Sequence, residues 1–277
     1  MSWKFSCADF TFPLLAHEKA LSLIRLLDVH AVDLGIFAGR SHWEPKDIVP
    51  NVEATARRMK QSLAASEIEP ADVFLQTGPE PSIHATNSPD PSIRAANRDT
   101  FKAILDFTTR IGCTHMTGLP GVTHSGVDPK ADLEHAAVET AWRVETARAS
   151  GVIYSIEPHL GSIIAEPERV TAFLRKVPGL TLTLDYGHFA FQNIPIDRVH
   201  PLLAHASHIH IRGGAADRLQ TNMSKNTIDF ADIALRLREM NYCGHVCLEY
   251  VWIDWMECNT SDNVSETILL KQLFERV

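Results

Sequence analysis

The chain has 277 residues, of which 45% are hydrophobic and 22% charged, a composition that excludes a disordered or low-complexity protein. With 26 basic and 34 acidic residues its formal net charge is −8, which argues against a nucleic-acid partner because phosphate contacts need clustered Lys and Arg. The odd number of five cysteines argues against a disulfide framework, and the N-terminus has no signal or anchor pattern, so we expect a cytoplasmic protein without a membrane partner.

Along the first half of the chain, apolar runs alternate with segments of helical period, which is typical of parallel strands joined by crossover helices. The predicted strands are residues 4–12, 31–37, 72–78 and 113–121, and the predicted helices are residues 17–28, 51–66, 93–111 and 132–149. In the first helix Ala20, Leu21, Ile24 and Leu27 share one face, as expected for packing against a barrel. The proline-rich segment after Gly78 predicts a long loop that lines an active site.

The second half of the chain continues the same alternation. Its predicted strands are residues 151–159, 180–188, 207–214 and 245–252, and its predicted helices are residues 167–176, 199–205, 230–240 and 265–277. No linker or shift in composition interrupts the series of eight strands and eight helices. The sequence therefore predicts one α/β domain over residues 1–277, a single (β/α)8 TIM barrel.

Four polar residues near the ends of the last four predicted strands indicate a metal site: Glu157, Asp185, His210 and Glu249. The carboxyl ends of barrel strands meet at one face, so we expect these side chains to lie together. Three carboxylates and one imidazole suit one divalent ion, Mn²⁺ above all, with Mg²⁺, Co²⁺ or Zn²⁺ as substitutes. Each residue alone also fits a helix cap or a loop salt bridge, but burying three carboxylates together without a cation would cost on the order of several kcal/mol. His208 shares a strand face with His210 and is interpreted as a packed or hydrogen-bonded residue.

These motifs resemble those of the xylose isomerase-like TIM barrels, often called sugar phosphate isomerases or epimerases. The matching segments are IEPH with Glu157, DYGH with Asp185 and His188, HIH with His210, and LEY with Glu249. The similarity is close over about residues 150–277 and only topological before them. It implies a divalent-metal barrel, often Mn²⁺-dependent and often a homo-oligomer, with a sugar or cyclitol as its small-molecule substrate.

The resemblance also implies a reaction, the isomerisation or epimerisation of a keto-sugar or related polyol. In relatives similar to D-tagatose 3-epimerase, the strand-five and strand-eight glutamates bind metal and move protons, which assigns catalysis to Glu157 and Glu249. A metal that bridges a ketone oxygen and the neighbouring hydroxyl acidifies the C–H bond between them and stabilises the enediolate, while one carboxylate takes the proton and another returns it. We expect His188 to donate a hydrogen bond to the polarised oxygen, Arg212 to offset negative charge, and His159 to contact the substrate.

Two departures from the family's motifs affect the predicted substrate. In the 3-epimerases a further acidic residue usually follows the strand-five glutamate, whereas the five residues after Glu157 contain none. The family's frequent Lys-Asp pair after the strand-seven histidine is replaced by Arg212 and Gly213. The groups that bind the sugar therefore differ, and with them the substrate.

Three other functions compete with the isomerase or epimerase. A lyase similar to the inosose and 3-dehydroshikimate dehydratases would use the same proton abstraction and then lose a β-leaving group, and Arg212, Arg218 and Lys225 would suit a carboxylated or phosphorylated substrate. A nuclease resembling endonuclease IV would need further His and Glu ligands, which the third and fourth predicted strands do not carry at their ends. A non-catalytic sugar-binding barrel would not need paired acid and base groups.

Overall fold

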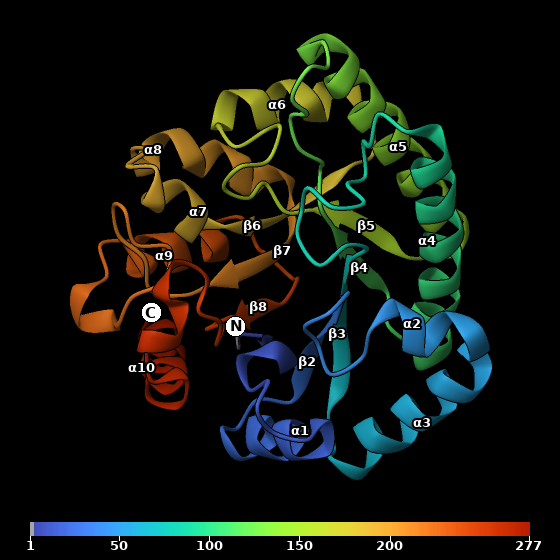
Figure 1. Cartoon of the computed structure of the whole chain (residues 1–277). Coiled ribbons are helices and arrows are strands. Elements are labelled where there is room, and N and C mark those ends of the chain that lie inside the picture. Colours follow the sequence, from blue (N-terminus) through green and yellow to red (C-terminus); the bar gives the residue numbers. More distant parts are fainter. Residues whose placement is uncertain (1–2) are drawn as a thin grey trace.

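The computed structural model describes residues 3–277, in which eight parallel strands close into one barrel in chain order (Figure 1). The strands are β1 (Phe5–Ala8), β2 (Ala31–Phe37), β3 (Glu69–Gln76), β4 (His115–Gly118), β5 (Ile153–Ile156), β6 (Thr181–Asp185), β7 (Ala206–Ile211) and β8 (Val246–Leu248). The ring closes where β8 pairs with β1, with Phe5 opposite Val246 and Cys7 opposite Leu248. The prediction of a (β/α)8 barrel is confirmed.

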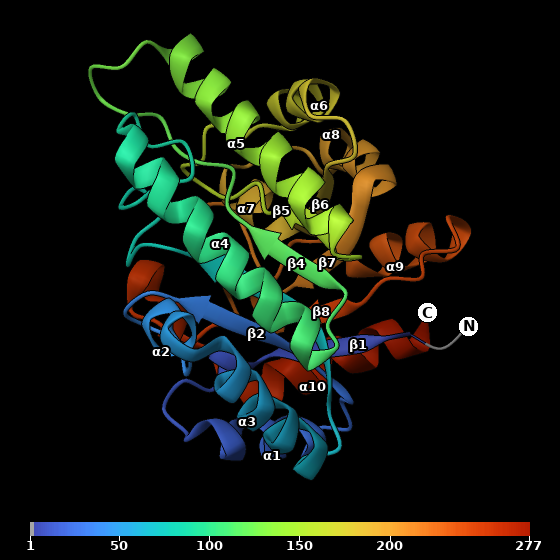
Figure 2. The same cartoon turned by 90° about the vertical axis from the view of Figure 1, so that its right-hand side faces the viewer.

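Helices surround the barrel on its outside, as Figures 1 and 2 show from two directions. They are α1 (His17–Leu26), α2 (Pro45–Ile48), α3 (Val52–Ala65), α4 (Pro91–Ile111), α5 (Pro129–Ala149), α6 (Pro167–Lys176), α7 (Tyr186–Phe191), α8 (Ile196–Val199), α9 (Phe230–Glu239) and α10 (Asn263–Arg276). On α1 the predicted inner face is buried at Ala20, Leu21 and Ile24 and half-buried at Leu27. Among residues 3–277, no helix is both long and apolar enough to cross a membrane.

The strands separate an apolar outer layer from a more polar interior. On β2, Val32, Leu34 and Ile36 belong to the hydrophobic cluster around the helices, whereas Asp33 and Phe37 alternate with them. Side chains on a strand alternate between its two faces, so Asp33 and Phe37 point into the barrel. The apolar layer fixes the strands, and the interior is free to carry polar groups.

A hydrogen-bonded layer of three hydroxyl groups lies inside the barrel between β4, β5 and β6. The Thr183 hydroxyl lies 2.7 Å from that of Thr117 and 2.6 Å from that of Ser155, so each of these buried groups has a partner. Because an unpaired buried hydroxyl would be costly, this mutual pairing lets three neighbouring strands carry polar residues inward. The layer lies beneath the carboxyl ends of the eight strands. These ends together form one face of the barrel, its mouth.

Most of the predicted strands are longer than the observed ones, and two of them run into residues that form helices. The first predicted strand, residues 4–12, forms only β1, and a short 3-10 helix follows at Asp9–Thr11. Residues 180–188 were expected to be one strand, but β6 ends at Asp185 and Tyr186–Phe191 is helix α7. Asp185 causes this change because its Oδ1 accepts a hydrogen bond from the backbone N–H of Gly187 at 2.7 Å and so caps the helix.

Candidate metal centre and active site

A cavity of about 170 Å³ opens at the mouth of the barrel. Its lining includes Glu157, His159, His188, Arg212 and Glu249, all of which were predicted site residues. The other two predicted residues, Asp185 and His210, are fully buried behind them. The fold therefore brings all seven predicted residues to one face of the barrel.

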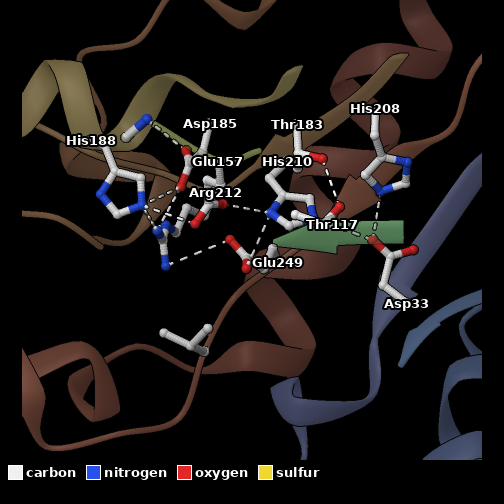
Figure 3. A network of polar contacts seen from close by, with 12 residues as sticks. Asp33, Thr117, Glu157, Thr183, Asp185, His188, His208, His210, Arg212 and Glu249 are labelled. Atoms are coloured by element: carbon white, nitrogen blue, oxygen red, sulfur yellow. Dashed lines mark hydrogen bonds and ion pairs between the residues drawn. The ribbon is translucent and has the colours of Figure 1, made fainter. Parts of the chain in front are cut away.

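The centre of the site is formed by Glu157, His210 and Glu249, which come from the ends of β5, β7 and β8. Nδ1 of His210 lies 2.9 Å from Oε1 of Glu157 and 3.2 Å from Oε1 of Glu249. Figure 3 shows the two carboxylates converging on the imidazole from different strands. One donor atom from each side chain lies within 4.8 Å of the others, a spacing at which all three can ligate one metal ion.

Asp185 joins this centre through Glu157, His188 and Arg212. Asp185, Glu157 and His188 form a second group of donor atoms within 4.8 Å of one another. Oδ2 of Asp185 accepts a hydrogen bond from Nη2 of Arg212 at 2.5 Å, and Nη1 of Arg212 lies 3.7 Å from Oε2 of Glu249. The guanidinium therefore holds two of the three carboxylates, and Asp185 has a protein partner as well as the spacing of a ligand.

The charges of the site fit a divalent cation. Glu157, Asp185 and Glu249 carry three negative charges in a buried place, against one positive charge on Arg212. Burial disfavours a charged His210, but Glu249, Asp33 and Glu157 outweigh it and raise the pKa of His210 well above its usual value, so without a metal this imidazole carries a proton that a divalent cation would displace. Oε2 of Glu249 is also a buried oxygen without a hydrogen-bond partner in the part of the chain described. An oxygen-rich donor set with one imidazole is of the kind that binds Mn²⁺ or Mg²⁺.

Comparison with known proteins identifies the family of the barrel. A family model described as xylose isomerase-like TIM barrel matches residues 24–270. The chain belongs to this family. The match to the xylose isomerase-like family extends through the first half of the chain, where the motifs alone gave only a topological similarity. A search of curated proteins found no match.

Solved structures that resemble this xylose isomerase-like barrel include three enzymes. D-psicose 3-epimerase from Clostridium cellulolyticum H10, solved with D-tagatose, has a TM-score of 0.77 and 16% identity over 99% of both chains. A 3-keto-D-glucoside 4-epimerase from E. coli has a TM-score of 0.75 and 13% identity over 100% of both chains. A probable 3-DHS dehydratase from Bacillus anthracis has a TM-score of 0.71 and 12% identity over 98% of both chains. At these identities the likeness concerns the fold.

The protonation states follow from burial and the nearby charges. Burial disfavours the carboxylate of Glu157, but hydrogen bonds with His188 and His210 outweigh it and hold the pKa of Glu157 well below its usual value. Burial likewise disfavours the charge on Arg212, but Asp185 and Glu249 keep its pKa raised and the guanidinium charged. Burial lowers the pKa of His159 to about 4, so this imidazole is neutral near pH 7. Glu157 is therefore ionised, as a metal ligand or a base must be.

The backbone of Leu160 orients His188 in this xylose isomerase-like site. The N–H of Leu160 donates to Nδ1 of His188 at 3.2 Å, and Nη2 of Arg212 lies 3.3 Å from its Nε2. Nε2 faces the carboxylates, at 3.6 Å from both Oε2 of Glu157 and Oδ2 of Asp185. His188 thus presents its Nε2 to the site, and its role as a hydrogen-bond donor to the substrate stays a prediction.

Asp33 is a candidate functional residue that the sequence analysis did not identify. It lies on β2 with 0% exposure, and its Oδ2 is 2.6 Å from Nε2 of His208 and 3.3 Å from Nε2 of His210 (Figure 3). The Asp33 carboxylate faces Nε2 of His210 and leaves its Nδ1–H turned toward the carboxylates of Glu157 and Glu249. A metal ion would displace that proton, and a carboxylate behind the ring is how metal-binding histidines are commonly oriented. The pairing with Asp33 also confirms that His208 is a hydrogen-bonded residue. The only sequence signal for Asp33 was one acid within the apolar run AVDLGIF.

We expect Asp33→Asn to weaken binding of a divalent cation by about 10- to 100-fold, the usual effect of removing the carboxylate behind a ligating histidine. The measurement is calorimetric titration of the EDTA-stripped protein with Mn²⁺. Asp72→Asn is a matched control, because Asp72 is equally buried and contacts a different histidine, with its Oδ1 2.6 Å from Nδ1 of His115. Equal Mn²⁺ affinity in the Asp33 and Asp72 variants would contradict a role for Asp33 in orienting His210.

Two cations considered for binding an anionic substrate do not lie in the cavity. Arg218 is exposed and pairs with Glu257 on the loop after β8, and Lys225 is exposed at the end of a short 3-10 helix. At the ends of β3 and β4 the cavity is lined by Gln76 and Leu119. Neither side chain is a metal ligand of the kind that an endonuclease IV-like site would need.

Proposed function

We propose that this protein is a divalent-metal-dependent isomerase or epimerase that moves a proton beside the carbonyl of a keto-sugar or related polyol. The observation that carries the proposal is the convergence of Glu157 and Glu249, whose carboxylates both line the cavity and lie within 3.2 Å of Nδ1 of His210. Two carboxylates at one cavity supply the base and the acid that such a transfer needs. The fold likeness to epimerases that act on psicose and on a keto-glucoside supports the choice of substrate.

The proposed roles follow from the positions of the side chains. A divalent cation, Mn²⁺ by preference, held by Glu157, Asp185, His210 and Glu249 would polarise the substrate carbonyl and stabilise the negative charge of the enediolate. Glu157 is ionised and takes the proton from the carbon beside the carbonyl, and Glu249 returns a proton to the substrate.

The remaining polar groups hold the substrate and its charge in place. His188 donates its Nε2–H to a substrate oxygen, and Arg212 offsets negative charge that develops next to Asp185 and Glu249. His159 is neutral, and its Nε2 has no partner among residues 3–277, so it is free to bind a substrate hydroxyl group. These contacts act on orientation and charge and leave the proton transfer to the two glutamates.

A lyase is the second candidate function. The fold likeness to a 3-DHS dehydratase favours it, and the first step would use the same base and the same cation. The two reactions differ only in whether the intermediate regains a proton or loses a β-leaving group. Mass spectrometry of the products separates them, because epimerisation conserves the mass of the substrate and dehydration lowers it by one water.

We expect the EDTA-stripped protein, reloaded with Mn²⁺, to hold about one metal ion per chain by mass spectrometry and to exchange solvent deuterium into a keto-sugar beside the carbonyl. Glu157→Gln combined with Asp185→Asn should lose both properties, because the double variant removes two of the four proposed ligands. Glu168→Gln combined with Asp197→Asn is a control of the same chemistry at exposed positions. Absence of a site-specific metal, or equal metal content in the two double variants, would rule out the proposed mechanism.

A further inference from the structure

Arg40 is a cation at the rim of the cavity that has no carboxylate partner. It follows β2 and lines the same cavity as Glu157 and Glu249. No ion pair formed within residues 3–277 includes Arg40; its Nη2 donates instead to Oε1 of Gln76 at 2.8 Å. Its guanidinium carbon lies 4.6 Å from the ring centroid of Phe37. An uncharged amide and an aromatic ring therefore hold Arg40, and its charge is left for another group.

The contacts around Arg40 fix its orientation. Gln76 is buried, and its Nε2 donates to the carbonyl oxygen of Gly78 at 2.8 Å, which leaves Oε1 directed at the arginine. Phe37 is buried and packs against its neighbours Phe10 and Phe74, with ring centroids 4.9 Å and 5.1 Å away. A guanidinium stacked on a ring and held at one nitrogen keeps its other N–H groups in a fixed plane, an arrangement that suits a planar anion.

The environment of Arg40 disfavours an unpaired charge. Although Arg40 is exposed at the rim, the cavity walls partly desolvate its guanidinium and lower its pKa, while the charges of Glu249 and Glu157 oppose that shift. Both glutamates are already engaged at the centre of the site by His210. They attract Arg40 from a distance and do not contact it. An anion that entered the cavity would supply the missing contact.

The net charge of the cavity also favours an anion beside Arg40. With a divalent cation bound, the cation and Arg212 balance Glu157, Asp185 and Glu249, so the centre of the site is neutral. Arg40 then leaves one positive charge at the rim. A neutral sugar would bury this charge without compensation, whereas a singly charged anion would neutralise it.

We propose that Arg40 binds a carboxylate of the substrate, so that the substrate is a small acid derived from a keto-sugar or cyclitol, with its carbonyl at the metal centre and its carboxylate at Arg40. The inference rests on the proposed function for the reacting end of the substrate. The inference adds a second contact to the substrate, made by Arg40. This residue follows β2 and is held by Gln76 of β3, whereas the four candidate metal ligands lie at the ends of β5 to β8. One negative charge and planar geometry favour a carboxylate over a phosphate.

The test compares three non-reacting six-carbon probes by calorimetric titration of the Mn²⁺-loaded protein: gluconate, glucitol and glucitol 6-phosphate. We expect gluconate to bind at least about tenfold more tightly than glucitol, the difference that one charge-assisted contact supplies. Arg40→Gln should abolish this preference and leave the affinity for glucitol unchanged, and Arg40→Lys should keep part of it. Arg110→Gln, at an exposed arginine that pairs with Asp106 on α4, should bind all probes as the unmodified protein does.

Each other outcome overturns the inference. It is wrong if gluconate shows no preference over glucitol, or if the preference survives in Arg40→Gln. If glucitol 6-phosphate binds more tightly than gluconate, the anion bound by Arg40 is a phosphate, and the proposed carboxylate is wrong. Because these measurements involve no turnover, an Arg40-dependent gluconate preference without deuterium exchange would refute the proposed function alone. Deuterium exchange into keto-sugars by a protein that shows no preference for gluconate over glucitol would refute this inference alone.

Discussion

Glu249→Gln should lower kcat by roughly 10²- to 10⁴-fold, the contribution of a positioned acid or base, without unfolding the protein. The amide has almost the shape of the carboxylate, so the packing against Arg212 and His210 changes little. It can no longer deliver a proton, and it is a weaker ligand for a cation. The measurement is the initial rate with a keto-sugar that shows solvent deuterium exchange in the unmodified protein.

Two further measurements make the result of Glu249→Gln decisive. Glu239→Gln, at an exposed residue at the end of α9, is a control for the loss of one negative charge. The metal content of the Glu249 variant separates two causes, because lost turnover with the metal retained identifies proton transfer, whereas lost metal identifies ligation. Unchanged turnover in Glu249→Gln would remove this residue from the mechanism.

Arg212→Met should lower the free energy of unfolding of the metal-free protein by about 3–5 kcal/mol, the usual cost of removing one partner of a buried ion pair. Methionine fills much of the space of the arginine stem, so the loss reports on charge more than on packing. Without the guanidinium, Asp185 loses its hydrogen bond at 2.5 Å and Oε2 of Glu249 loses the cation that lies 3.7 Å away. Urea denaturation monitored by circular dichroism gives the difference.

Arg198→Met is the matched control for this measurement. Arg198 makes a bidentate pair with Glu168, but both side chains are about half exposed, so its loss should cost less than about 1 kcal/mol. Mn²⁺ should stabilise the Arg212 variant by more than it stabilises the unmodified protein, because the same cation then meets three uncompensated carboxylates. Equal destabilisation by the two arginine variants in the absence of metal would contradict the charge balance described for the site.

The barrel and the residues of its mouth were predictable because both leave local signals. Apolar runs followed by Glu157, Asp185, His210 and Glu249 mark strand ends, and the strand order then brings these ends together without further information. The helix at Tyr186–Phe191 was missed because the hydrophobic run continues through Tyr186, and the capping role of Asp185 overrides it.

The other groups of the site depend on contacts that the sequence does not contain. Asp33 and His208 are 175 positions apart in the sequence. Their side chains meet, with Oδ2 2.6 Å from Nε2, only because both point into the interior of the closed barrel. Arg40 lies in a polar loop, where most arginines are solvated, and its role depends on Gln76 and Phe37 from two strands. Pairings across the interior of a barrel therefore require coordinates.

The mouth of the barrel has two unlike halves. The ends of β5 to β8 carry the carboxylates and the imidazole. The 3-10 helix after β1 and the strands β2 and β3 contribute Phe10, Phe37 and Phe74, and Arg40 follows β2. Mutations in the aromatic half can thus change which molecule is accepted while the reacting groups stay in place, so one chemistry can be inherited unchanged as the substrate diverges. Asp33 is the exception, since it lies on β2 and contacts His210. We therefore expect Asp33 to vary less among related proteins than the aromatic residues of the same half.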